Sequence, residues 1–248
     1  MTLGGTSETT FRLFALLTTG TLTHYIDNLG ITGLTSNPSI YKKAIGTSSA
    51  YDQTIERLSV SGADVQTTFF ELALDDLGRA ADMFLPIHLR TGGVDGFVSL
   101  EVSPLLAHDA ETTRSEARRL HAKSGRSNLF IKIPGTRAGL EAIEESIFSG
   151  VPVNVTLLFS TDQTLLAFAD HGTVSGMLAV DRDPENEAML ARFEASGVDL
   201  AGLASRLQEQ GVDAFVRAWQ SLLSLINQKA AAGSKRASAD RQSTVGNL

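Results

Sequence analysis

The sequence contains no cysteine, which excludes disulfide bonds, thiolate metal sites and cysteine nucleophiles. It also lacks an excess of basic residues, since 21 Lys and Arg stand against 28 Asp and Glu and give a net charge of −7. An acidic chain of this kind is not expected to bind nucleic acid or an anionic membrane as its main partner. The five histidines show no metal-ligand spacing, so we predict no metal site.

Long apolar runs are missing as well. No stretch approaches the roughly 18 residues that a membrane helix requires. The opening MTLGGTSETT has no basic segment followed by an apolar core, so it predicts no signal peptide. We therefore expect a cytoplasmic protein. The remaining composition, 42% apolar and 20% charged in 248 residues, is typical of an ordinary globular chain.

Short β-branched runs alternate with helical patterns through the first part of the chain. The clearest strand candidates are residues 31–35, 96–102, 129–134 and 153–159, with a weaker candidate at 10–17. Helical patterns are found at residues 71–85, 111–123 and 137–148. This alternation predicts βαβ units and a parallel sheet, and therefore an α/β fold.

After residue 159 the sequence predicts only helices, at 185–195, at 199–210 and in a long segment with an apolar stripe from Val212 to Ile226. The polar face of this last helix is not strongly basic, so packing on a sheet or partner is favoured over membrane binding. The polar, serine-rich segment 233–248 is predicted to be disordered. We expect one α/β domain over residues 1–232, with a strand–helix part at 9–160 and a helical part at 162–232.

Strand side chains alternate between two faces, and here one face of each clear strand is apolar while the other carries polar groups near its carboxyl end. In a parallel α/β barrel these polar groups would converge at the active-site end. An antiparallel sheet with one solvated face is the alternative, and the intervening helices disfavour it. The polar set comprises Thr35, Asn37, Glu101, Lys132, Asn154 and Thr156.

Lys132 draws attention because it lies between two isoleucines in the strand candidate LFIKIP. A buried ammonium group is costly to desolvate, and burial favours the free amine, which attacks carbonyl carbons to form a Schiff base. Glu101 and Thr156 on the same face favour chemistry, because imine formation requires proton transfers. The alternative is a charge that protects an edge strand from aggregation.

Four segments resemble the transaldolase family, particularly its longer bacterial form: GITGLTSNPSIYKKAI, VSLEVSPLLAHD, NLFIKIPGTRAGLEAI and GVPVNVTLLFS. LAFADHGTVSG and the closing helices resemble the C-terminal end of that form. The resemblance implies a TIM-barrel-derived (β/α) fold that uses no metal or organic cofactor. It also implies transfer of a dihydroxyacetone unit from a ketose phosphate to an aldose phosphate through a lysine Schiff base.

The same resemblance implies roles for the polar set. Lys132 would be the Schiff-base nucleophile, and Glu101 and Thr156 would hold the water that relays protons. The substrate hydroxyls would be bound by Thr35, Asn37 and Asn154.

The chain departs from the family in two places. Thr10 stands where the family has a first-strand aspartate, and the sixth to eighth strands, with the arginines that bind phosphate, are missing between Ser160 and Thr164. We therefore expect an incomplete barrel of about five parallel strands, which cannot close in the usual geometry. An open sheet edge must be covered, either by the C-terminal helices or by another chain, and we favour a homo-oligomer. The resemblance implies that its substrates are sugar phosphates.

Three functions remain open at this point. The first is a transaldolase-type transferase, specialised for an unusual sugar. The second is a catalytically impaired relative that acts as a binding or assembly partner. The third is a simple Schiff-base aldolase without a preferred acceptor.

Overall fold

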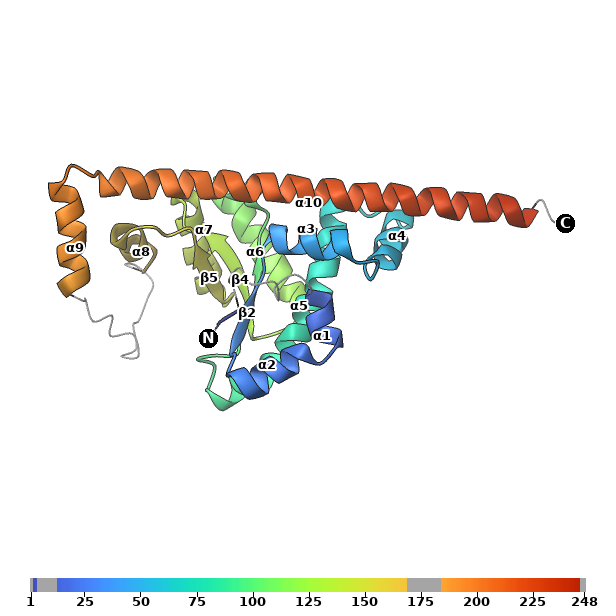
Figure 1. Ribbon diagram of the computed structural model, residues 1–248, viewed down its shortest axis with the longest axis horizontal. Helices are drawn as coiled ribbons and strands as arrows, with labels where there is room; N and C mark the ends of the chain where they lie inside the picture. Colours follow the sequence, from blue (N-terminus) through green and yellow to red (C-terminus); the bar gives the residue numbers. More distant parts are fainter. Residues whose placement is uncertain (1, 4–12, 169–183, 246–248) are drawn as a thin grey trace.

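The computed structural model describes residues 2–3, 13–168 and 184–245 (Figure 1). Its centre is a parallel sheet whose strands follow one another in chain order. The strands are β1 (Thr2–Leu3), β2 (Gly33–Thr35), β3 (Val98–Glu101), β4 (Leu129–Pro134) and β5 (Val153–Thr156). Sequential parallel order with helices between the strands is the arrangement of a TIM-type barrel, so the predicted α/β fold class is confirmed. Within the described residues β5 pairs only with β4, and the barrel is not closed.

Helices connect the strands, and every described element after β5 is a helix. They are α1 (Leu13–Thr18), α2 (Thr21–Leu29), α3 (Pro38–Thr47), α4 (Asp52–Val60), α5 (Val65–Arg90), the 3-10 helix η2 (Pro104–Leu106), α6 (Ala110–Ser124), α7 (Arg137–Phe148), α8 (Thr161–Phe168), α9 (Pro184–Ala195) and α10 (Leu200–Val245). The helices predicted between the strands are confirmed as α5, α6 and α7, and the segment predicted at 185–195 is α9. The hydrophobic period was a sufficient guide for these four helices, whereas the sequence did not predict α2, α3 or α4.

The weak strand candidate at residues 10–17 was wrong where the structure describes it. Residues from Leu13 onward form α1, and the first strand is instead the short β1 near the N-terminus. Leucine and alanine, which dominate LFALLT, are strong helix formers, so the local preference agrees with the helix. Thr10, which stands where the family has an aspartate, lies outside the described residues.

The C-terminal helices also differ from the prediction. The segments expected at 199–210 and from Val212 onward form one continuous helix, α10, which spans the length of the molecule (Figure 1). Its backbone stays helical through Val245, across most of the segment for which the sequence predicts disorder. That segment contains no proline, the residue that would remove a backbone hydrogen bond from the helix.

The apolar face of the sheet packs against the helices. Leu129, Ile131 and Ile133 of β4 are fully buried, as are Phe84 of α5 and Leu120 of α6. The alternation predicted for β4 therefore places its isoleucines in the core and turns Lys132 to the opposite face.

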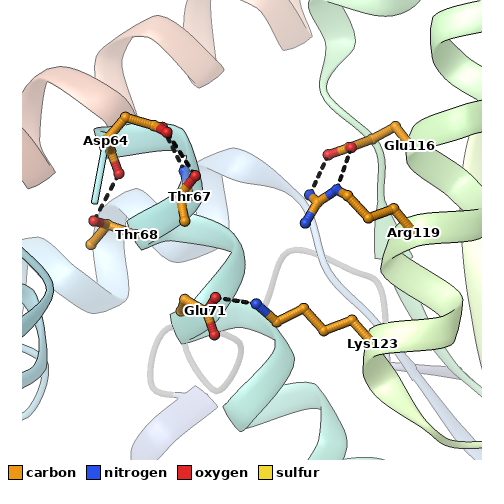
Figure 2. Close-up of polar contacts among 7 residues, drawn as sticks. All are labelled: Asp64, Thr67, Thr68, Glu71, Glu116, Arg119 and Lys123. Carbon is orange, nitrogen blue, oxygen red and sulfur yellow. Dashed lines mark hydrogen bonds and ion pairs between the residues drawn. The ribbon is translucent and has the colours of Figure 1, made fainter. Parts of the chain in front are cut away.

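Polar contacts hold the start of α5 and its junction with α6 (Figure 2). Asp64 caps α5, because its carboxylate accepts hydrogen bonds from the backbone N–H of Thr67 at 2.8 Å and from the Thr67 hydroxyl at 2.7 Å. Lys123 of α6 forms an ion pair with Glu71 of α5. These contacts hold α5, which precedes the strand carrying Glu101, against α6, which connects that strand to the one carrying Lys132.

Candidate active site

Three of the six predicted site residues lie in one row across the sheet. Glu101 is the register partner of Lys132, and Lys132 is the register partner of Asn154. Register partners on parallel neighbouring strands point to the same face, so these three side chains are adjacent. Lys132 therefore lies between a carboxyl group and a carboxamide, on the face opposite the apolar core.

Lys132 and Glu101 form a buried ion pair. Their side chains are only 11% and 7% exposed, and the Nζ–Oε2 distance is 3.6 Å. That distance exceeds a direct hydrogen bond, and among the described residues Oε2 has no hydrogen-bond donor. Burial raises the pKa of Glu101 to about 7, although the charge of Lys132 partly offsets that rise. Near neutral pH Glu101 can therefore both give and take a proton.

Asn154 is held by a residue that sequence reasoning did not select. Its Nδ2 donates to Ser99 Oγ at 3.0 Å, and the Ser36 hydroxyl donates to the backbone carbonyl of Ser99 at 2.9 Å. Ser99 shares the face of Glu101 on β3, and that shared parity is the one sequence signal that could have identified it.

The other three predicted residues lie outside this row. Thr35 is the register partner of Ser99, one row further from the carboxyl end, and its buried hydroxyl has no hydrogen-bond partner within the described part of the chain. Asn37 caps α3, because its Oδ1 accepts from the backbone N–H of Ile40 at 3.0 Å. Thr156 is two residues beyond Asn154, at the end of β5. Of these three, only Asn37 has a clear local structural role.

Helix α10 adds two side chains that the sequence did not point to. Nζ of Lys132 lies 5.2 Å from the ring centre of Phe215, within range of a cation–π contact. Gln208 Nε2 donates to the carbonyl oxygens of Gly135, at 2.8 Å, and Leu157, at 2.9 Å. Gly135 and Leu157 directly follow β4 and β5, so α10 crosses the carboxyl ends of these strands beside the site.

The described residues do not bring metal-binding side chains together at this site. No cluster of three His, Asp or Glu side chains with metal-binding geometry occurs among the described residues. In the same part of the chain, every helix is too short or too polar to cross a membrane.

A parallel α/β sheet with a buried lysine–glutamate pair beneath its carboxyl end defines a barrel-type protein with a candidate Schiff-base site. Comparison with known families gives the particular assignment. The family model described as transaldolase/fructose-6-phosphate aldolase matches residues 16–175, which is more than half of the chain. The chain belongs to this family.

Individual relatives agree with the family model. "Transaldolase 2" of Nostoc punctiforme is 37% identical over 224 residues, which cover 87% of this chain and 59% of the relative. "Transaldolase" of Renibacterium salmoninarum is 46% identical over 144 residues, covering 58% of this chain and 38% of the relative. "Transaldolase" of Frankia alni is 42% identical over 184 residues, or 74% of this chain and 50% of the relative. The chain thus spans 38–59% of the length of these three relatives.

Proposed function

We propose that the protein transfers a dihydroxyacetone unit from a ketose phosphate to an aldose phosphate acceptor through a Schiff base on Lys132. The observation that carries this proposal is the buried Lys132–Glu101 pair, with the Glu101 pKa raised to about 7. A buried amine beside a carboxyl group that titrates near neutrality is suited to imine chemistry. The transaldolase names of the relatives agree with this reaction.

The reaction begins when the free amine of Lys132 attacks the ketose carbonyl. The carbinolamine loses its hydroxyl as water, with a proton supplied from Glu101 through a water molecule that Thr156 also holds. The bond between the carbon next to the iminium and the hydroxyl-bearing carbon beyond it then breaks, and the iminium accepts its electron pair. This step releases an aldose and leaves an enamine on Lys132, while the proton of the substrate hydroxyl passes to the water relay.

The second half of the reaction reverses these steps on the acceptor. The enamine attacks the aldehyde carbon of the acceptor, and the new alkoxide takes back a proton. Water then hydrolyses the imine and restores the amine. We assign Asn154, Thr35 and Asn37 to the substrate hydroxyls; Asn154 stands beside Lys132 in the register row, which makes it the nearest of the three.

The test is chemical trapping of the imine. The protein is incubated with fructose 6-phosphate or sedoheptulose 7-phosphate, reduced with borohydride and analysed by intact-protein mass spectrometry. We expect a three-carbon adduct that is lost in Lys132→Ala and retained in Lys42→Ala, since Lys42 is exposed on α3. An adduct that persists in Lys132→Ala would disprove the assignment of the nucleophile.

Two alternatives give different results in the same experiment. A catalytically impaired assembly partner, which the open sheet at β5 favours, forms no adduct with either ketose phosphate. A simple aldolase forms the adduct and releases free dihydroxyacetone at a rate that added aldehyde acceptors do not change. A transferase instead gives a new ketose phosphate when the acceptor is added.

We also propose that a second copy of the chain covers the edge at β5 and the apolar side chains near it. Phe148 at the end of α7 is 89% exposed, and Phe159 after β5 is 43% exposed. Exposed apolar surface of this kind, beside a strand that has a neighbour on one side only within the described residues, is typical of an interface. Light scattering is expected to show a dimer or larger assembly, and a monomer with full activity would contradict the proposal.

A further inference from the structure

Phe215 is placed over the amine of Lys132 by contacts on both sides of it in α10. On its N-terminal side Gln208 binds the carbonyl groups that end β4 and β5. On its C-terminal side Trp219 is 1% exposed and lies edge-on to Phe69, with ring centres 4.9 Å apart. The spacing of these residues along α10 puts them on one helical face, which meets the strand ends at Gln208 and α5 at Trp219.

The approach of α10 to the strand ends is close. A side chain at Gly211 would bring its Cβ to 2.7 Å from a methyl group of Leu157, so only glycine fits there without displacing Leu157. Gly211 lies one turn before Phe215. The backbone of α10 therefore passes close to the residue that follows β5, and one turn later the ring centre of Phe215 lies 5.2 Å from Nζ of Lys132.

We propose that Phe215 is the residue that determines which carbonyl compounds reach Lys132. Its ring limits the width of the carbonyl compound that can approach Nζ, and its face stabilises the positive charge of the iminium. The site thereby favours carbonyl compounds that have narrow substituents on the carbon that bonds to Lys132. This inference rests on the proposed use of Lys132 as the nucleophile.

The experiment measures the size selectivity of the amine. The full chain is treated with cyanoborohydride and either formaldehyde or benzaldehyde, and modification of Lys132 is followed by peptide mass mapping. The exposed Lys42 in the same molecule serves as the reference amine. In Phe215→Ala the ratio of benzaldehyde to formaldehyde modification at Lys132 is expected to rise about tenfold, equivalent to about 1.4 kcal/mol of lost discrimination.

Two further variants distinguish a limit on the width of the aldehyde from an effect of the aromatic ring of Phe215 and from a general loosening of α10. Phe215→Leu retains apolar cover and guards against a misfolded alanine variant; it should give an intermediate selectivity ratio. Phe193→Ala removes a half-exposed ring on α9 and should leave the ratio unchanged. An unchanged ratio in both Phe215 variants, or equal acceleration of both aldehydes, would overturn the proposal, because a helix that simply opens exposes the amine to all reagents.

The outcome is separable from that of the proposed function. Aldehyde modification requires only an amine at residue 132, whereas ketose trapping requires the whole reaction site. If no ketose adduct forms but the selectivity ratio rises in Phe215→Ala, the transferase proposal fails and Phe215 still controls access to the amine. If the ketose adduct forms and the ratio does not change, Phe215 has no such role.

Discussion

Strands β4 and β5 are neighbours in one sheet, but their apolar side chains end in different surroundings. Ile131 and Ile133 of β4 are 0% exposed, whereas every residue of β5 is only half-buried. The same contrast runs along the helices: Trp219 and Leu222 of α10 are buried, while Leu203 and Leu207 near its start are 39% and 38% exposed. The molecule thus has a packed region around β2–β4 and an open region around β5, α9 and the first turns of α10.

This difference shows which residues of the candidate site are held in place by buried side chains. The carboxyl–amine pair lies on β3 and β4, at the border of the packed region, while Asn154 and Thr156 lie on the open strand. The residues proposed for bond chemistry are thus fixed by a buried core. By contrast, Asn154 and Thr156, which are proposed to bind substrate and water, lie on β5. Their positions depend on the chain that is proposed to cover this strand.

The largest loss of stability is expected from a substitution in the packed part of α10. Trp219→Ala removes a buried ring that contacts Phe69 and Phe70, and should lower the free energy of unfolding by about 3–5 kcal/mol. Leu207→Ala in the open part of the same helix should cost under about 1 kcal/mol, because the leucine is partly solvated already. Urea unfolding followed by circular dichroism measures both; equal losses would show that the two parts of α10 are equally packed.

A matched pair of strand variants tests the same contrast within the sheet. Ile131→Ala leaves a cavity in a fully buried position and should cost about 2–4 kcal/mol. Val155→Ala on β5 should cost about 1 kcal/mol or less in the isolated chain, since the valine is half-buried. A large loss for Val155→Ala would mean that β5 is covered in solution, and light scattering on the same samples would identify an oligomer as the cause.

The raised pKa of Glu101, a residue proposed to take part in the chemistry, makes the stability of the packed region depend on pH. Its pKa rises from 4.5 in a solvated chain to about 7 in the fold, so the folded state binds more protons between these values. Its contribution to stability is therefore fully present below about pH 4.5 and is lost as the pH rises through 7.

Glu101→Gln removes this titration. We expect the variant to be more stable than the parent by about 1–2 kcal/mol at pH 8, less than the full effect of the pKa shift because Lys132 loses its partner. Asp76 is the control: burial raises its pKa to about 6, and Asp76→Asn should remove a separate part of the pH dependence. If the difference between the urea midpoints of Glu101→Gln and the parent stays constant from pH 5 to pH 8, the raised pKa of Glu101 is disproved.

The smallest effect on the folded chain is expected in the open region. Phe148→Asp replaces an 89% exposed ring at the end of α7, and should change the free energy of unfolding by less than about 0.5 kcal/mol. It should nevertheless weaken association of the proposed oligomer, seen as a lower average mass in light scattering. An unchanged mass would place the interface elsewhere.

Much of the packed region could be predicted from the sequence. The alternation in LFIKIP was enough to predict that Lys132 points away from the isoleucines. The strands on either side of it were located correctly because β-branched runs alternate with amphipathic helices. Prediction failed at α1, where an apolar run too short to show a period was read as a strand. The continuity of α10 was missed because nothing in the local pattern distinguishes one long helix from two that follow closely.

The sequence by itself determined the order of the strands, the polar face that holds Lys132, Glu101 and Asn154, and the family. These depend on the two-residue period of strands and on local motifs, both of which are carried by neighbouring residues. Only the tertiary structure decided that α10 returns to the strand ends, where Gln208 binds two backbone carbonyls and Phe215 covers the amine. Phe215 and Lys132 are far apart in the chain. Their contact follows from the packing of α10 on α3, α4 and α5, which no local pattern encodes.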